Sequence, residues 1–405
     1  MAKNNRKKKW MRFRHRIVTE ILRIVLGPYS RIKYGIKVKK FREQGNRQYL
    51  VLMNHQTAFD QFFVGLAFRG PIYYVASEDL FSKGWLSALI KYLVAPIPIK
   101  KQTTDVRAVL NCIKVAKEGG TIAIAPEGNR TYSGKTEYMS PSIVSLAKKL
   151  AMPIALFRIE GGYGVHPRWS DVVRRGKMTG YVSEVIEPEE FDAMSDDELY
   201  ERIKNGLYVN EAVADGEFRH KKSAEYLERA IYVCPKCGLS QFESHNDTVS
   251  CKKCGLCARY TSKKELVGVE GEFPFHFVND WYDYQSDFMN RFDAAAHTDS
   301  PLYEERGALS EVIVYKNKLP ICDDAKIALY GDKIVLGTGD GEMQLHFDSV
   351  SAVVVLGKNK LNIYYGEHLY QIKSDKRFNA LKYVHMYYRY KNIKKGEESE
   401  LFLGI

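Results

Sequence analysis

Short apolar segments alternate with helical patterns over the first half of this 405-residue chain. This alternation predicts a mostly parallel sheet covered by helices, because parallel strands need a crossover connection between them, usually a helix. In such sheets, active sites collect in the loops beyond the strand ends. A capping box at Ser195 and Glu198 predicts a further helix. The predicted strands are Tyr49–Met53, Ile72–Ala76, Ala95–Ile99, Thr121–Ala125 and Ile154–Ile159.

The first of these strands runs into a loop that contains a histidine and ends at an aspartate. His55 lies in this loop and Asp60 opens an apolar helix. A carboxylate beside an imidazole can fix its tautomer and stabilise the imidazolium that forms when it accepts a proton. The spacing itself is not specific, because His166 and Asp171 share it. We prefer His55 because it lies between a strand and a helix, whereas His166 precedes a proline in a stretch without periodicity.

A second polar loop follows the strand Thr121–Ala125. It reads Pro126-Glu127-Gly128-Asn129-Arg130. Arg130 suits a phosphate, Gly128 lets the backbone approach a ligand, and Glu127 can accept hydrogen bonds from a polyol. Taken alone, such a turn is typical of an ordinary surface loop.

Together, His-x4-Asp and the Pro-Glu-Gly-x-Arg that follows about seventy residues later resemble the glycerolipid acyltransferase family, which includes lysophosphatidic acid acyltransferases. The resemblance covers roughly residues 43–215. The family's second motif, a glycine and an apolar run ending in a phosphate-binding arginine, is matched in part. Ala95 stands at the glycine and Lys101 at the arginine. The fourth motif falls on the apolar run after Pro153.

The resemblance implies that His55 removes a proton from the free hydroxyl of a lysophospholipid, which then attacks the thioester of acyl-CoA or acyl-carrier protein. Asp60 would orient His55, and Lys101, Glu127, Gly128 and Arg130 would bind substrate. The expected acceptor is 1-acylglycerol 3-phosphate, and the product is phosphatidic acid. Lysine lacks the planar fork of arginine. Another lysophospholipid or glycerolipid acceptor therefore remains an alternative.

Five of the seven cysteines lie between positions 234 and 257. Cys234, Cys237, Cys251 and Cys254 form two C-x2-C pairs, each followed by glycine, a pattern that resembles a zinc ribbon with a closed structural site. Cys257 extends the second pair and raises an iron–sulfur alternative, but the ferredoxin completion is absent, so we expect it not to bind the metal. The clustering indicates a reducing compartment, and the predicted location is cytoplasmic.

The net charge of +12 is concentrated at the start of the chain. Residues 1–42 carry 15 basic side chains and one acid, so the remainder is −2. Apolar residues recur at helical spacing from Trp10 to Leu26, with basic residues between them. This arm is predicted to lie on an anionic membrane surface, on its inner face. A helix packed on the protein's own body is the alternative, and the nearly neutral remainder argues against nucleic acid.

The last hundred residues read as short strands separated by glycine or asparagine turns and closed by one helix, an order that resembles a pleckstrin-homology-like domain. The overall prediction is an α/β acyltransferase domain with a helix-covered, mostly parallel sheet, then a zinc ribbon and a small mainly-β domain. A protein partner for the C-terminal modules is a further expectation. The alternative function is a non-catalytic module in which the ribbon binds protein or nucleic acid. The predicted arm covers residues 1–42 and the predicted acyltransferase domain residues 43–215. The ribbon is predicted at 228–262, a linker with an aromatic helix at 263–305, and the pleckstrin-homology-like domain at 306–405.

Overall fold

The computed structural model describes residues 9–82, 84–99, 105–313, 317–339 and 341–396. The chain divides into two compact units, and each is made of segments that are not consecutive in sequence. The first unit comprises residues 1–128, 139–160 and 178–209, and the second comprises residues 129–138, 161–177 and 210–405. None of the helices formed by the described residues is long and apolar enough to cross a bilayer.

The first unit is a seven-stranded sheet in the order β1-β7-β6-β2-β5-β3-β4, and every neighbouring pair is parallel except β6 with β7. The predicted mostly parallel sheet is therefore confirmed. Strand β2 lies centrally, with Leu50 opposite Ile122 of β5 and Ile154 of β6. The strands are β1 Ile36–Val38, β2 Leu50–Met53, β3 Ile72–Ser77, β4 Ile97–Ile99, β5 Thr121–Ile124, β6 Ile154–Glu160 and β7 Met178–Ile186.

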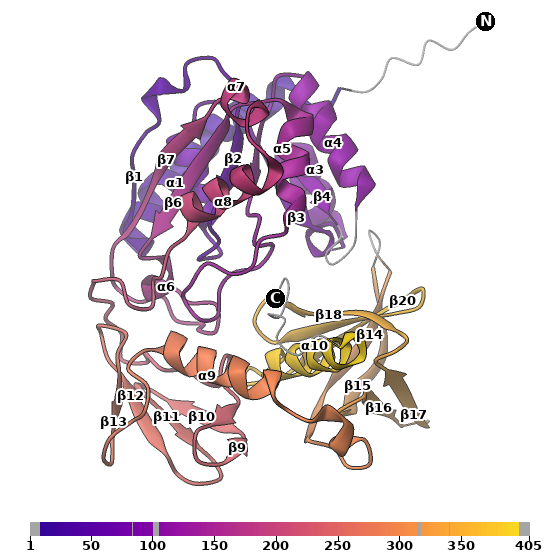
Figure 1. Cartoon of the computed structure of the whole chain (residues 1–405). Coiled ribbons are helices and arrows are strands. Elements are labelled where there is room, and N and C mark those ends of the chain that lie inside the picture. Colours follow the sequence, from indigo (N-terminus) through magenta and orange to yellow (C-terminus); the bar gives the residue numbers. More distant parts are fainter. Residues whose placement is uncertain (1–8, 83, 100–104, 314–316, 340, 397–405) are drawn as a thin grey trace, which may run out of the picture. The chain divides into compact units, whose positions relative to one another are not determined.

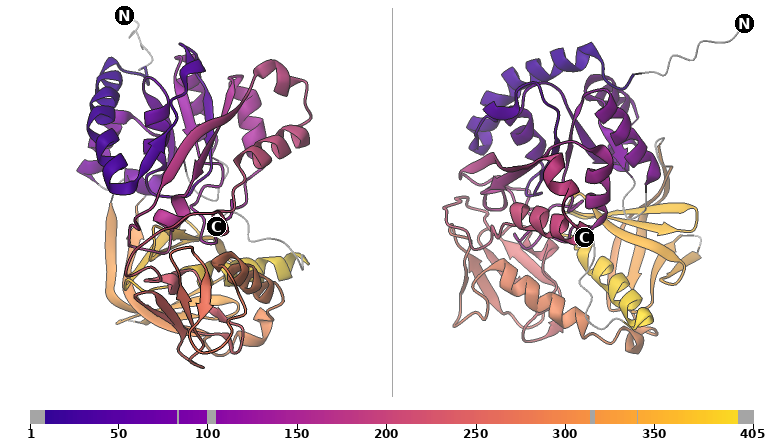
Figure 2. Two further views of the ribbon diagram at one scale, coloured as in Figure 1. Left: turned by 90° about the vertical axis from the view of Figure 1, so that its left-hand side faces the viewer. Right: turned by 45° about the horizontal axis from the view of Figure 1, so that its top comes forward.

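Helices cover both faces of this sheet (Figure 2). On one side α2 contacts β1, β6 and β7, and α1 packs on α2. On the other side α4 and α8 pack against the sheet, and α5 packs on both of these helices. The fully buried side chains of β2 lie in the core between these layers. The helices are α1 Phe13–Tyr34, α2 Asp60–Ala67, α3 Trp85–Val94, α4 Val106–Lys117, α5 Ser142–Leu150, α7 Pro188–Asp192 and α8 Asp196–Leu207.

The second unit contains the cysteine-rich region, a long aromatic helix and the C-terminal sheet (Figure 1). Four antiparallel strands form one sheet, β10 Phe242–His245, β11 Thr248–Cys251, β12 Cys257–Tyr260 and β13 Leu266–Gly268, beside the short pair β8 Val233–Cys234 and β9 Gly238–Leu239. Strand β13 lies beyond the predicted end of the ribbon at residue 262, because Leu266–Gly268 pairs with β12. Helix α9, Val278–Asn290, is the predicted aromatic helix, and α6 is the short helix Gly162–Val165.

The C-terminal sheet has seven antiparallel strands in the order β17-β16-β15-β14-β20-β19-β18, and α10 packs on β18. The small mainly-β domain is therefore confirmed. Strand β14 begins at Tyr303, inside the predicted linker. The elements are β14 Tyr303–Val312, β15 Lys318–Leu329, β16 Lys333–Thr338, β17 Gly341–His346, β18 Val350–Leu356, β19 Lys360–Tyr365, β20 His368–Ser374 and α10 Leu381–Lys395.

Candidate functional site

The loop after β2 brings His55 and Asp60 into direct contact. The Nδ1 atom of His55 lies 2.7 Å from Oδ2 of Asp60. Asn54 joins this loop to β6, since its side chain both donates to the carbonyl and accepts from the N–H of Ile159. His55 therefore lies outside helix α2, and Asp60 lies within its first turn. Two residues five positions apart on one helix would point to different faces, so the contact requires His55 to be outside the helix.

Asp60 is fully buried and held by the loop that it closes. The backbone N–H groups of Gln56 and Thr57 and the hydroxyl of Thr57 all donate to its carboxylate. With Asp60 ionised, Nδ1 of His55 is the donor and the lone pair is on Nε2. The imidazole remains 26% exposed, so the pair combines a fixed carboxylate with an accessible base.

Glu127 connects the second polar loop to the first. Its Oε1 atom accepts the backbone N–H of His55 at 2.7 Å, and its side chain is buried. Gly128 has φ +68°, and its own N–H donates to the carbonyl of Ala125. A glycine suits this tight turn because a side chain is disfavoured in the left-handed region. The Glu127 carboxylate thus has the N–H of His55 as a partner within the protein. The sequence predicts a contact of this carboxylate with a polyol, and that contact stays a prediction.

Arg130, two residues after Gly128, belongs to the second unit. Its side chain is half-buried. Its backbone carbonyl accepts a hydrogen bond from Nη1 of Arg168 at 2.9 Å. Lys101, the other predicted phosphate ligand, lies outside the described residues. Ala95, at the position of the family's glycine, ends α3 with φ +43°, a left-handed conformation that glycine adopts more readily.

The second His-x4-Asp pair is arranged differently from the first. Lys358 lies between His166 and Asp171, with its ammonium 3.4 Å from Nε2 of His166 and 2.9 Å from Oδ1 of Asp171. Burial, and then the charges of Lys358 and Arg130, lower the pKa of His166 to about 3. Although burial alone raises it, hydrogen bonds from Arg229 and Lys358 lower the pKa of Asp171 to about 2. His166 is therefore neutral near pH 7 and buried among cations.

Four cysteine thiols converge in the ribbon. The Sγ atoms of Cys234, Cys237, Cys251 and Cys254 all lie within 4.8 Å of one another, and those of Cys234 and Cys254 are 3.7 Å apart. A tetrahedral zinc with Zn–S bonds of about 2.3 Å requires sulfur atoms about 3.8 Å apart. The donor set and its spacing therefore fit a closed zinc site. Cys257 lies in β12, outside this cluster.

The apolar residues of α1 face outward. Phe13 is 77% exposed, Ile24 72% and Ile32 86%, whereas the buried residues of the helix are His15, Ser30 and Tyr34. Helix α3 packs beside α1 and adds Trp85, which is 78% exposed. Arg14 joins the two helices by donating to the carbonyl of Tyr92 and stacking on its ring. We call the exposed side chains of Phe13, Ile17, Ile21, Ile24, Val25, Ile32, Trp85 and Tyr92 the apolar face of the first unit.

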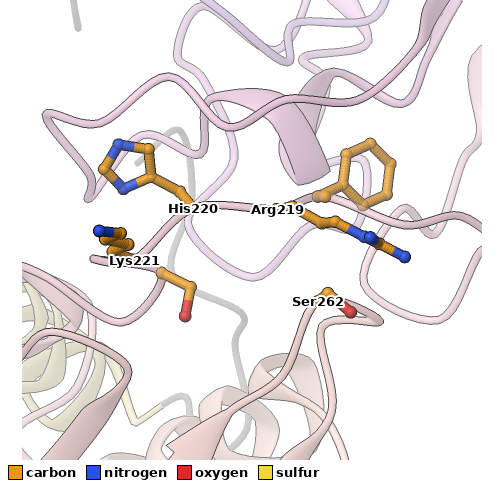
Figure 3. A pocket seen from close by; sticks show the side chains of 6 residues that line it. Arg219, His220, Lys221 and Ser262 are labelled. Carbon is orange, nitrogen blue, oxygen red and sulfur yellow. The ribbon is translucent and has the colours of Figure 1, made fainter.

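A hollow of about 390 Å³ lies on the second unit. Figure 3 shows Arg219, His220 and Lys221 along one chain segment and Ser262 on another. Phe218 and Ser223 complete the lining. None of the site residues predicted from the sequence lines it.

Parts of this chain are similar to known proteins. Residues 35–159 match the acyltransferase family. The chain is similar to a 1-acyl-sn-glycerol-3-phosphate acyltransferase of Bacillus subtilis (strain 168), at 21% identity over 179 residues, covering 44% of this chain and 84% of that protein. The 1-acyl-sn-glycerophosphate acyltransferase PlsC of Thermotoga maritima is similar at 22% identity over 49% of this chain and 80% of its own, with a TM-score of 0.41. The N-terminal PH domain of human ARAP2 is similar at 13% identity, over 24% of this chain and 87% of its own, with a TM-score of 0.19.

Proposed function

We propose that this chain, which carries an acyltransferase domain in residues 35–159, transfers a fatty acyl group from acyl-CoA or acyl-carrier protein to the free hydroxyl of a lysophospholipid. The expected acceptor is 1-acylglycerol 3-phosphate, and the expected product is phosphatidic acid. The hydrogen-bonded pair of His55 and Asp60, inside the matched segment and at the end of a central strand, is the observation that carries the proposal.

In this reaction His55 is the general base. Its Nε2 accepts the proton of the acceptor hydroxyl while the hydroxyl oxygen bonds to the thioester carbonyl carbon. The carbon–sulfur bond then breaks, and the proton held on Nε2 passes to the departing thiolate. Asp60 stabilises the imidazolium between these two steps and keeps Nε2 free to accept the proton. Because the hydroxyl attacks the thioester directly, no acyl-enzyme forms.

Cationic side chains supply the proposed head-group contacts. Arg130 carries a planar guanidinium, a group that can bind two phosphate oxygens at once, and Lys101 would add a second positive charge. Gly128 leaves its turn open, since a Cβ built there would meet nothing within 4 Å. An anionic acceptor head group fits this set better than a neutral one.

The apolar face of the first unit supports a bilayer surface as the place of reaction. A face of large exposed apolar side chains is unusual on a protein that contacts only water. Arg12 at the N-cap of α1, and Arg16, Arg31 and Lys33 within the helix, are also exposed, and each basic residue near an anionic leaflet contributes about 1 kcal/mol of binding. We therefore place the protein peripherally on the inner face of the membrane, with anionic lipids as partners. The four-cysteine site would hold a structural zinc.

Acyl transfer to lysophosphatidic acid in anionic vesicles, measured with both thioester donors, tests the function. We expect His55→Ala to lower kcat by about 100-fold to 10,000-fold, the range typical of general-base catalysis. His166→Ala should keep kcat within about threefold of the wild type, because burial and the charges of Lys358 and Arg130 lower the pKa of His166 and make it a poor proton acceptor. Unfolding midpoints show whether each variant folds. Normal turnover by His55→Ala would refute the assignment, and a wild type inactive on every lysophospholipid would refute the function.

A further inference from the structure

Two loops that follow strands of the first unit belong structurally to the second unit. Strand β5 ends at Ile124, and residues 129–138 that follow it lie in the second unit. Strand β6 ends at Glu160, and residues 161–177 that follow it lie there as well. Ligands of open α/β sheets bind beyond the carboxyl ends of such strands. The loop that carries Arg130 is therefore shaped by the C-terminal modules.

Arg168 joins this loop to the C-terminal sheet. Its Nη1 donates to the carbonyl of Arg130 at 2.9 Å, and its Nη2 donates to the carbonyl of Val355 in β18 at 3.2 Å. The guanidinium also lies 4.3 Å from the ring centre of Tyr132. Arg168 is only 3% exposed. A planar guanidinium with fixed donors is well suited to hold two carbonyls at one separation.

Other contacts fix the same loop from the second unit. The N–H of Glu211 donates to the carbonyl of Gly134 at 2.8 Å, and Lys135 pairs with Asp283 of α9. Gly134 has φ +93°, and a Cβ there would lie 2.9 Å from the backbone nitrogen of Ala212. The loop is therefore packed closely along its length. Of these contacts, the one from Arg168 lies on the peptide group of Arg130 itself.

We propose that Arg168 is a positioning residue that sets the conformation of the Arg130 loop, and through this loop the recognition of the acceptor. The proposal rests on the proposed function, in which Arg130 binds the acceptor's phosphate. It gives the C-terminal sheet a role in substrate specificity through β18. It also predicts which kinetic constant depends on that sheet: the KM for the acceptor rather than kcat or the KM for the donor.

The chain offers a matched control in Arg174. This residue is also buried, lies in the same segment, donates to the carbonyls of Gly164 and Ser223, and stacks between Trp169 and Tyr260. Its carbonyl partners are outside the Arg130 loop. Arg168→Met and Arg174→Met therefore remove the same group from equally buried positions, and only the first removes a contact to Arg130.

We expect Arg168→Met to raise the KM for lysophosphatidic acid at least tenfold while kcat and the donor KM change by less than about threefold. Hydrogen exchange of peptides covering residues 129–138 should become at least tenfold faster. Arg168→Lys keeps the charge but cannot bridge both carbonyls, so it should restore folding stability and leave the acceptor KM raised. Arg174→Met should leave the acceptor KM and the exchange of the loop unchanged.

Unchanged acceptor KM in both Arg168 variants, or an equal rise in Arg174→Met, would overturn the proposal. Full rescue by Arg168→Lys would do so too, because charge alone would then suffice. The exchange measurement needs no activity, so it tests the positioning role of Arg168 separately from the proposed acyl transfer. If the wild type transfers no acyl group, the proposed function fails and the recognition role falls with it. Exchange of the loop still decides whether Arg168 holds it.

Discussion

At the scale of residues, the sequence selects the candidate pair of His55 and Asp60 by context and does not predict its surroundings. Two His-x4-Asp pairs are indistinguishable by spacing, and their tertiary partners differ: Asp60 contacts His55 directly, whereas Lys358 lies between His166 and Asp171. No local pattern reveals Lys358, since it is 192 positions from His166. The contact of Glu127 with the N–H of His55 is equally hidden, because it joins loops 72 positions apart.

That contact makes Glu127 a testable link between the two loops. A hydrogen bond to a charged group contributes about 1.5–3 kcal/mol, and the His55 N–H would lose its partner in Glu127→Ala. We therefore expect Glu127→Ala to lower kcat/KM by about tenfold to 100-fold. Glu127→Gln keeps an acceptor oxygen of similar reach, so it should retain most of the activity. Steady-state kinetics on both variants measures these changes in kcat/KM. An equal loss of kcat/KM in Glu127→Gln and Glu127→Ala would show that the negative charge of Glu127 itself matters.

At the scale of elements, periodicity predicts where helices and strands occur better than which side of them is buried. The apolar spacing from Trp10 predicts α1, and the helix continues through Pro28 to Tyr34. Gly27 allows this continuation to lie close to α2, since a Cβ there would meet Leu66 at 3.2 Å. In α4, Val106 and Leu110 are exposed although these apolar residues are four positions apart, the spacing of one helix face. Tertiary packing, absent from a local pattern, selects the buried side.

The apolar face of α1 can be tested by point substitutions that leave its buried side intact. Ile24→Gln combined with Ile32→Gln removes two exposed side chains, each worth up to about 1.5–3 kcal/mol when buried. We expect at least tenfold weaker binding to anionic vesicles, measured by sedimentation, with an unchanged unfolding midpoint. Val106→Gln on α4 is the matched control, because Val106 is also exposed and apolar. Equal vesicle binding by the double variant would contradict a membrane role for this face.

At the scale of the whole molecule, the chain passes between its two units several times. Patterns along the sequence suggest consecutive blocks, because each pattern reports on neighbouring residues only. The structure instead places residues 129–138 and 161–177 with residues 210–405. Their core is shared: Tyr132 and Trp169 belong to the same buried cluster as Cys234 of the ribbon and Leu361 of the C-terminal sheet. The modules of the second unit are therefore coupled through one hydrophobic core.

This shared core determines how far the destabilisation caused by the loss of zinc should extend. Structural zinc sites bind with an apparent free energy of about 10–16 kcal/mol, as large as the total stability of many domains. We expect one zinc per chain by metal analysis, and no change in zinc content in Cys257→Ser. Chelation should accelerate hydrogen exchange in α10 and β18–β20 as well as in the ribbon, since all belong to one cluster, while the strands of the first unit keep their protection. Iron with sulfide, or no metal, would contradict the zinc site, and exchange confined to residues 233–268 would show that the ribbon unfolds independently of the C-terminal sheet.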